Sequence, residues 1–124
     1  MPRKEYNKRL TNLDILELFE NGSYWVDLNE GVVYSDQKKA PVYTYEGNAE
    51  GHLFTRLYSQ PKHRSLPVTH VVWMFGTREA LPAKWEIHHR DLDVQNNSFN
   101  NLVAVHPIDH RKLHADTPVD EVPF

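Results

Sequence analysis

Two short strand-like segments, separated by a long polar loop and followed by a pair of histidines, constrain this chain more than any other feature. Residues 85–89 and 102–105 have the length and composition of two strands, and the loop between them is rich in asparagine. Pro107 is a favourable first residue for a helix that we expect to run to about His114. The segment predicts a strand–loop–strand–helix unit too small to bury much surface, which a metal joining strand to helix would stabilise.

Four histidines occupy the two ends of this unit. His88 and His89 are neighbours, so in an extended segment their side chains point to opposite sides. His110 and His114 have i,i+4 spacing, which places both rings on one face of a helix. Imidazole is the commonest side-chain metal ligand. One of the adjacent histidines could therefore bind a metal with the helix pair while the other performs proton chemistry, although a histidine pair on a helix is by itself more often solvated surface.

Two stretches of the chain carry a resemblance to a known family. They read HHRDLDVQNNSFNNL over residues 88–102 and DHRKLH over residues 109–114. This pattern resembles the HNH endonucleases, also called ββα-metal or His-Me finger nucleases, and is most similar to phage and intron-encoded members. Two residues depart from it. Leu92 stands where the loop of the family usually has glycine, and His88 stands where many homing members have aspartate.

Upstream segments extend the resemblance more weakly. GHLFTRL (51–57) and THVVWMFG (69–76) are similar to the strand and helix that often precede the nuclease core, and WVDLNEGVVYS resembles a small β motif that often leads such chains. The resemblance implies an α+β fold in which a β-rich N-terminal segment is followed by a ββα-metal HNH module. The expected parts are the β-rich segment with a short helix (1–65), the nuclease module (66–116) and an acidic flexible tail (117–124).

The resemblance also implies roles for individual residues. His89 matches the general base that deprotonates water, a task that suits a side chain able to exchange a proton near cellular pH. Asn101 matches the asparagine that ties the loop together and helps to orient the base. His88 and His110 match metal ligands, and His114 matches a third ligand found in some members.

One divalent metal ion is the cofactor that the resemblance implies. Three imidazole ligands favour Zn, Ni or Mn over Mg, which prefers oxygen, and the sequence leaves the ion open among these four. In such enzymes the metal binds an oxygen of the scissile phosphate and the leaving 3′ oxygen. The expected products are a 5′-phosphate and a 3′-hydroxyl.

Charge is distributed unevenly along the chain. Residues 1–51 carry a net charge of −3, residues 52–114 carry +3, and residues 115–124 carry −3, while all eight histidines lie between His52 and His114. The net positive charge and the histidines thus lie in the same segment, as a site for DNA phosphates requires. Because this positive charge is small, we expect DNA binding to be weak. A solvated surface role is an equal alternative for each candidate phosphate contact. These candidates are Arg64, Lys84, Arg90, Arg111 and Lys112.

Local signals predict the remaining elements. Thr11 or Asn12 should cap a helix that ends at Asn21–Gly22, and the residues around Asn29–Gly31 should form a hairpin turn. Pro67 should be the first residue of a second helix and Gly76 its stop, and His70 within it should be a packed histidine rather than a ligand. The predicted strands are 23–28, 31–34, 41–45 and 51–58, and residues 60–65 are predicted to be a polar loop.

Several classes of protein are excluded or disfavoured. The chain of 124 residues has no cysteine, which excludes a disulfide scaffold, a thiolate metal site and a cysteine nucleophile. It has no apolar run of membrane-spanning length and no visible secretory signal, so we expect no membrane association and a cytoplasmic location, that of a bacterial host if a phage encodes it. A calcium loop starting at Asp91 fails, because Asn96 and Leu102 stand where glycine and glutamate are needed.

Three functions are compared on this basis. The first is a metal-dependent endonuclease that nicks or cuts DNA. The second is a non-catalytic, metal-stabilised DNA-binding or phage packaging accessory module, and the third is a structural domain without metal. Replacing His89 separates the first two, because it would abolish cleavage in one and matter little in the other. The sequence leaves open the choice between DNA and RNA, the recognition sequence, and whether a homodimer or a partner protein completes the recognition surface.

Overall fold

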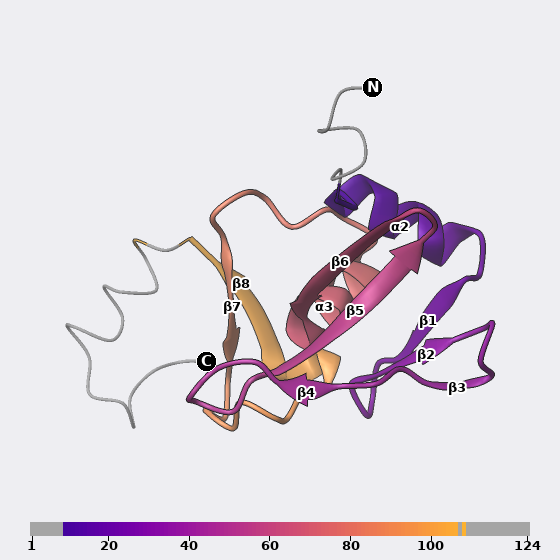
Figure 1. The fold of residues 1–124 in the computed structure, drawn as a ribbon. Coiled ribbons are helices and arrows are strands. Elements are labelled where there is room, and N and C mark those ends of the chain that lie inside the picture. Colours follow the sequence, from indigo (N-terminus) through magenta and orange to yellow (C-terminus); the bar gives the residue numbers. More distant parts are fainter. Residues whose placement is uncertain (1–8, 107, 109–124) are drawn as a thin grey trace.

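The fold was analysed in a computed structural model that describes residues 9–106 and residue 108. The described part mixes two α-helices with antiparallel strands, as expected for an α+β protein (Figure 1). Neither helix is long and apolar enough to cross a membrane. The elements in chain order are α2 (Asn12–Glu20), β1 (Tyr24–Asp27), β2 (Val32–Ser35), β3 (Ala40–Pro41), β4 (Tyr45–Glu46), β5 (Leu53–Ser59), β6 (Lys62–Pro67), α3 (Val68–Thr77), β7 (Glu86–His89), the 3₁₀ helix η1 (Phe99–Asn101) and β8 (Leu102–Val105).

The strands form three separate antiparallel sheets, ordered β1-β2-β3, β4-β5-β6 and β7-β8. Helix α3 contacts strands of all three sheets, and in Figure 1 it lies behind the long β5–β6 hairpin. Its residues Val71, Val72 and Met74 are fully buried. Because α3 packs on every sheet, it fixes the position of the β7–β8 hairpin relative to the N-terminal strands.

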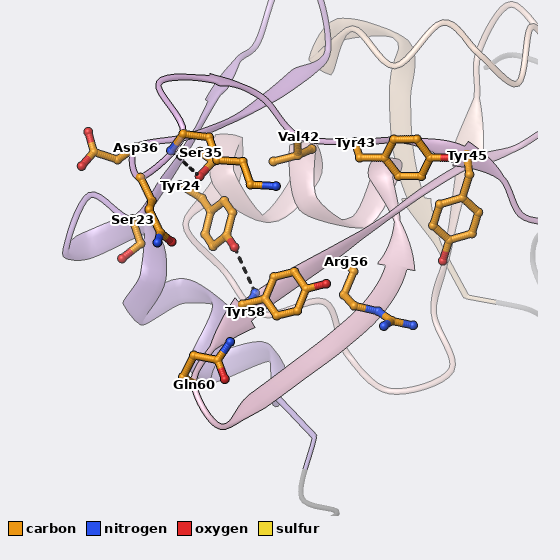
Figure 2. A pocket seen from close by; sticks show the side chains of 12 residues that line it. Ser23, Tyr24, Ser35, Asp36, Val42, Tyr43, Tyr45, Arg56, Tyr58 and Gln60 are labelled. Atoms are coloured by element: carbon orange, nitrogen blue, oxygen red, sulfur yellow. Dashed lines mark hydrogen bonds between the residues drawn. The ribbon is translucent and has the colours of Figure 1, made fainter.

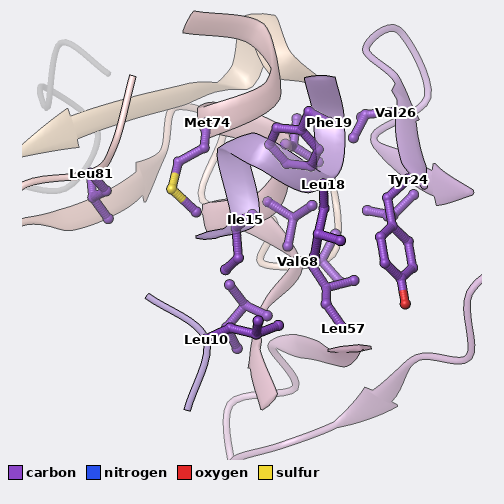
Figure 3. Packing of buried hydrophobic residues seen from close by; sticks show 14 of the residues in the cluster. Leu10, Ile15, Leu18, Phe19, Tyr24, Val26, Leu57, Val68, Met74 and Leu81 are labelled. Carbon is purple, nitrogen blue, oxygen red and sulfur yellow. The ribbon is translucent and has the colours of Figure 1, made fainter. Parts of the chain in front are cut away.

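One apolar cluster forms the core around α3. Ile15 and Leu18 of α2, Leu57 of β5 and Leu102 of β8 all belong to it, and Figure 3 shows the α2 and β5 side chains packed together. The cluster therefore includes residues from both sides of the segment boundary expected at residue 65. The division of the chain into an N-terminal segment and a nuclease module at residue 65 stays a prediction.

Helix α2 starts where the capping signal predicted. The Thr11 hydroxyl accepts a hydrogen bond from the backbone N–H of Asp14 (3.0 Å), and the Asp14 carboxylate accepts one from the backbone N–H of Thr11 (2.8 Å). This reciprocal capping box satisfies two of the backbone donors that a helix leaves unpaired at its start. Thr11, rather than Asn12, is the cap.

The prediction of a loop over residues 60–65 was wrong, because Lys62–Pro67 forms strand β6. It pairs with β5 in a register that sets Leu66 opposite Thr55 and Arg64 opposite Leu57. Leu66 is 1% exposed, so its burial in the core stabilises a strand that polar, basic composition argues against. The strand predicted over residues 41–45 was also wrong. It is divided into β3 and β4, which belong to different sheets.

The boundaries of α3 differ from those predicted. Pro67 is the N-cap rather than the first helical residue, and the helix continues through Gly76 to Thr77. Arg78 then ends it in the left-handed conformation (φ 60°), donating its backbone N–H to the carbonyl of Met74 at 2.8 Å. Gly76 has a packing role instead, since a Cβ added there would overlap the ring of Phe99.

His70 of α3 is a packed histidine, and it makes stability depend on pH. Burial, together with a smaller contribution from the nearby Arg64 charge, lowers its pKa to about 4. Between pH 4 and 6.5 the unfolded chain therefore binds more protons at this residue than the folded chain does. The contribution of neutral His70 to the free energy of unfolding is complete above about pH 6.5 and is lost as the pH falls towards 4. We expect the free energy of unfolding to drop by about 2 kcal/mol more between about pH 7 and about pH 5 in the native chain than in His70→Gln. Urea unfolding at both pH values measures this, and equal drops in the two proteins would contradict it.

Candidate active site

The β7–β8 hairpin places the two adjacent histidines at its closed end. β8 spans the predicted residues 102–105, and β7 spans Glu86–His89, one residue shorter at its start than predicted. The two strands pair with His88 opposite Val103 and His89 opposite Leu102. Both rings are buried, with 5% and 4% of their surface exposed. Histidine is not usually buried to this degree, so each ring must be held by its surroundings.

The ring of His89 is held by an amide that the sequence analysis did not single out. Its Nε2 lies 3.0 Å from Oδ1 of Asn97, which is itself 3% exposed. An amide oxygen only accepts, so Nε2 carries the proton, and in the neutral ring Nδ1 then keeps its lone pair. The ring is thereby fixed in the form that can accept a proton at Nδ1.

Asn101 closes the loop between the strands. Its Oδ1 accepts the backbone N–H of Asp91 (3.1 Å), and its Nδ2 donates to Asp91 Oδ1 (2.9 Å) and to the carbonyl of Asn96 (2.8 Å). The loop-tying contact expected of Asn101 is therefore present. The contact with the ring of His89 comes from Asn97 instead. Asn96 and Asn97 are neighbours in an irregular loop, where no periodicity shows which amide faces His89.

The Asp91 carboxylate organises the start of the same loop. It accepts hydrogen bonds from Asn96 Nδ2 (2.7 Å) and from the backbone N–H of Asp93 (2.9 Å), and these bonds hold its pKa below the usual value. Leu92 follows in the left-handed conformation, with φ 66°. The backbone therefore takes the conformation for which glycine is the easiest residue, although leucine stands at this position.

Two other parts of the chain hold this loop from outside. The carbonyl of Leu28, in the β1–β2 turn, accepts the backbone N–H of Phe99 at 2.8 Å. Gly31 of the same turn lies so close that a Cβ there would overlap the backbone carbonyl of Asn97. On the other side, Gln95 donates from Nε2 to the carbonyl of Gly51, in the β4–β5 turn, at 2.9 Å. The loop is thus clamped between two N-terminal hairpin turns.

The comparisons with known proteins agree with this geometry. No protein-family model matches the sequence, and no curated protein gives a significant match. Among solved structures, the chain is similar to the HNH homing endonuclease I-HmuI, studied for its DNA binding and cleavage, with a TM-score of 0.58 and 21% identity. The similarity covers 81% of this chain and 57% of that one. The chain has an HNH-type endonuclease fold.

Within this HNH-type fold the expected site residues are only partly brought together. His88, His89 and Asn101 lie in the β7–β8 hairpin, and Arg90 is exposed directly after β7. Lys84 is exposed before β7. The remaining expected site residues, His110, His114, Arg111 and Lys112, lie outside the described residues.

Arg64 has a structural partner. It lies on β6, and its guanidinium donates to Oδ1 of Asn12 at 2.6 Å and to the carbonyl of Leu10 at 3.5 Å. Burial, with repulsion from Arg9, lowers its pKa. The side chain therefore fastens the start of α2, and a role in binding phosphate stays a prediction.

Of the three predicted metal ligands, His88 lies in the described residues. No group of three or more histidine, cysteine, aspartate or glutamate side chains within residues 9–106 could hold a metal ion. His88 suits such a role, because it is a buried imidazole near the end of a strand. The other two predicted ligands, His110 and His114, follow later in the sequence. The Asp91 carboxylate does not belong to this set, since amide and backbone donors already occupy its oxygens.

A pocket lined by tyrosines lies elsewhere in the described residues. It has a volume of about 920 Å³ and sits between the β1–β3 sheet and β5, where Figure 2 shows tyrosine rings around it. The hydroxyl of Tyr24 accepts the backbone N–H of Tyr58 at 3.0 Å across its floor. All of its lining residues lie between Ser23 and Gln60, and none is a histidine. The chemistry of the β7–β8 hairpin, not the size of this pocket, locates the candidate active site.

Proposed function

We propose that this protein is a metal-dependent HNH endonuclease that hydrolyses phosphodiester bonds of DNA. The observation that carries the proposal is the buried His89 ring, held at Nε2 by Asn97 with Nδ1 left to accept a proton. The HNH-type fold supports it, because I-HmuI, which shares that fold, binds and cleaves DNA. The chain spans only part of I-HmuI, so the activity of the whole enzyme belongs to the proposal.

His89 would act as the general base in the hydrolytic step. A water molecule next to Nδ1 attacks phosphorus through its oxygen and gives its proton to Nδ1. The bond between phosphorus and the 3′ oxygen breaks, and the leaving oxygen takes a proton from solvent. The cut strand then has a 5′-phosphate on one fragment and a 3′-hydroxyl on the other.

His88, His110 and His114 would hold one divalent metal ion, the last two being outside the described residues. Neutral nitrogen donors suit Zn, Ni or Mn better than Mg. When bound, such an ion offsets negative charge on the phosphate as the transition state forms. The proposal places the ion held by His88 and the base His89 at the same phosphate, beside the closed end of the β7–β8 hairpin.

Basic side chains near the hairpin would bind the DNA backbone. Arg90 and Lys84 are exposed at the two ends of β7, and Arg111 and Lys112 are adjacent to the expected ligand His110. Arg64 is the weakest member of this set, because it already binds Asn12. Few phosphate contacts predict modest affinity that falls as salt is added.

Cleavage of supercoiled plasmid tests the proposal. We expect the purified protein to convert the plasmid to nicked or linear forms with at least one of Mg, Mn, Ni and Zn, and EDTA to stop the reaction, because removing the ion removes its charge from the phosphate. Gel electrophoresis of the products measures this. An intact plasmid with every metal would refute the nuclease. Metal-dependent DNA binding without cleavage would assign the non-catalytic accessory role instead.

A further inference from the structure

A second imidazole lies beside the proposed base. The ring of His52, at the end of the β4–β5 turn, is centred 5.7 Å from the ring of His89, and the two planes are inclined by 47°. The His52 side chain is 29% exposed, whereas His89 is 4% exposed. His52 is therefore the more exposed of the two neighbouring rings.

Asn48 holds the His52 ring in the β4–β5 turn. Asn48 Oδ1 accepts the backbone N–H groups of Glu50 and His52, each at 3.1 Å. The Nδ2 and Oδ1 atoms of the same amide lie 3.0 Å and 3.2 Å from His52 Nδ1. When Nδ1 accepts from Nδ2, the ring carries its proton at Nε2. The Glu50 carboxylate lies 3.7 Å from the same Nδ1.

The same turn is attached to the active-site loop. Gln95 of that loop donates to the carbonyl of Gly51 at 2.9 Å, and Gly47 donates its backbone N–H to the carbonyl of His52 at 3.0 Å. Gly51 adopts a φ of 89°, and a Cβ there would come within 3.5 Å of Gln95 Nε2. His52 thus holds a set position relative to His89, which a solvated surface histidine would not.

We propose that His52 is a second catalytic residue, whose Nε2–H donates a hydrogen bond to a non-bridging oxygen of the phosphodiester attacked at His89. The proposal rests on the proposed nuclease function. In an in-line displacement the attacking water and the leaving oxygen lie on opposite sides of phosphorus. A donor beside the base therefore faces the non-bridging oxygens. Its hydrogen bond becomes stronger as negative charge accumulates on these oxygens in the transition state.

A packing role is the alternative, and two variants separate it from catalysis. His52→Phe keeps a ring without a donor, whereas His52→Gln keeps an N–H near the position of Nε2 and loses the ring. If His52 binds phosphate, we expect kcat to fall about 10- to 100-fold in His52→Phe and to stay within about threefold in His52→Gln, with KM little changed in both. His63→Phe, which changes an exposed histidine on β6, should cleave like the native chain.

The opposite pattern, with His52→Phe fully active and His52→Gln impaired, would overturn the assignment in favour of packing. A second readout does not depend on cleavage. With ¹⁵N-labelled histidine, the Nε2 signal of His52 should shift when a short DNA duplex is added in EDTA, and the His63 signal should shift less. A His52 signal that does not move would refute the contact. Failure of the native chain to cleave plasmid, with the His52 shift present, would refute the nuclease and leave the phosphate contact standing.

Discussion

Replacing His89 with alanine is expected to lower the cleavage rate about 10³-fold without unfolding the protein. A positioned general base contributes about 10²- to 10⁴-fold to hydrolysis, and the burial and Asn97 contact of His89 give it a single orientation. Water would have to lose its proton to solvent in the variant. DNA binding in EDTA should stay within about twofold, because His89 is buried and contributes no fixed charge to the phosphate-binding surface.

Single-turnover cleavage of supercoiled plasmid measures the effect, with DNA affinity taken from fluorescence anisotropy. His63→Ala is the matched control, because it removes an exposed imidazole from β6. Equal rates for His89→Ala and the native chain would exclude His89 as the base. A loss of DNA affinity that accounts for the whole loss of rate would assign it to binding instead.

Replacing Gly31 with alanine is expected to destabilise the fold by about 2–5 kcal/mol and to slow cleavage. Gly31 adopts a φ of 70°, which costs a residue with a side chain about 1–2 kcal/mol. The new Cβ would also overlap the backbone of Asn97, and overpacking of this kind costs about 1–3 kcal/mol. Because Asn97 holds the ring of His89, relief of the overlap must move the group that orients the proposed base.

Gly22→Ala provides the control for this prediction. Gly22 also has a positive φ, of 80°, but nothing lies within 4 Å of the position its Cβ would take. It should therefore lose only about 1–2 kcal/mol and cleave at the native rate. Urea unfolding and plasmid cleavage by the folded fraction measure both variants. Equal losses in the two would show that the β1–β2 turn does not press on the active-site loop.

The proposed site combines residues from a strand, a loop and a turn. His89 comes from a strand, Asn97 and Asn101 from the loop that follows it, and His52 from a turn of a different sheet. The β1–β2 and β4–β5 turns both hold the loop, so the N-terminal hairpins support the site as well as the core. In an HNH-type chain of this length, little of the described structure is independent of the active-site loop.

The sequence by itself determined the elements whose signals are local. Thr11, one of the two predicted caps, marked the start of α2, and the apolar residues 102–105 marked β8. The histidine pair at the end of β7 was placed correctly for the same reason, because alternation and turn signals act over a few residues. The motif that joins these pieces was sufficient to predict the HNH-type fold.

Only the tertiary structure decided the contacts between distant segments. Strand β6 forms because Leu66 is buried and its backbone pairs with β5, although its own composition predicts a loop. Asn97, rather than its neighbour Asn96, faces His89, because the clamped loop has an irregular path with no period to read. His52 reaches His89 only because Gln95 fastens one turn to another. Such contacts depend on where the core places whole elements, and no local pattern in the chain encodes that placement.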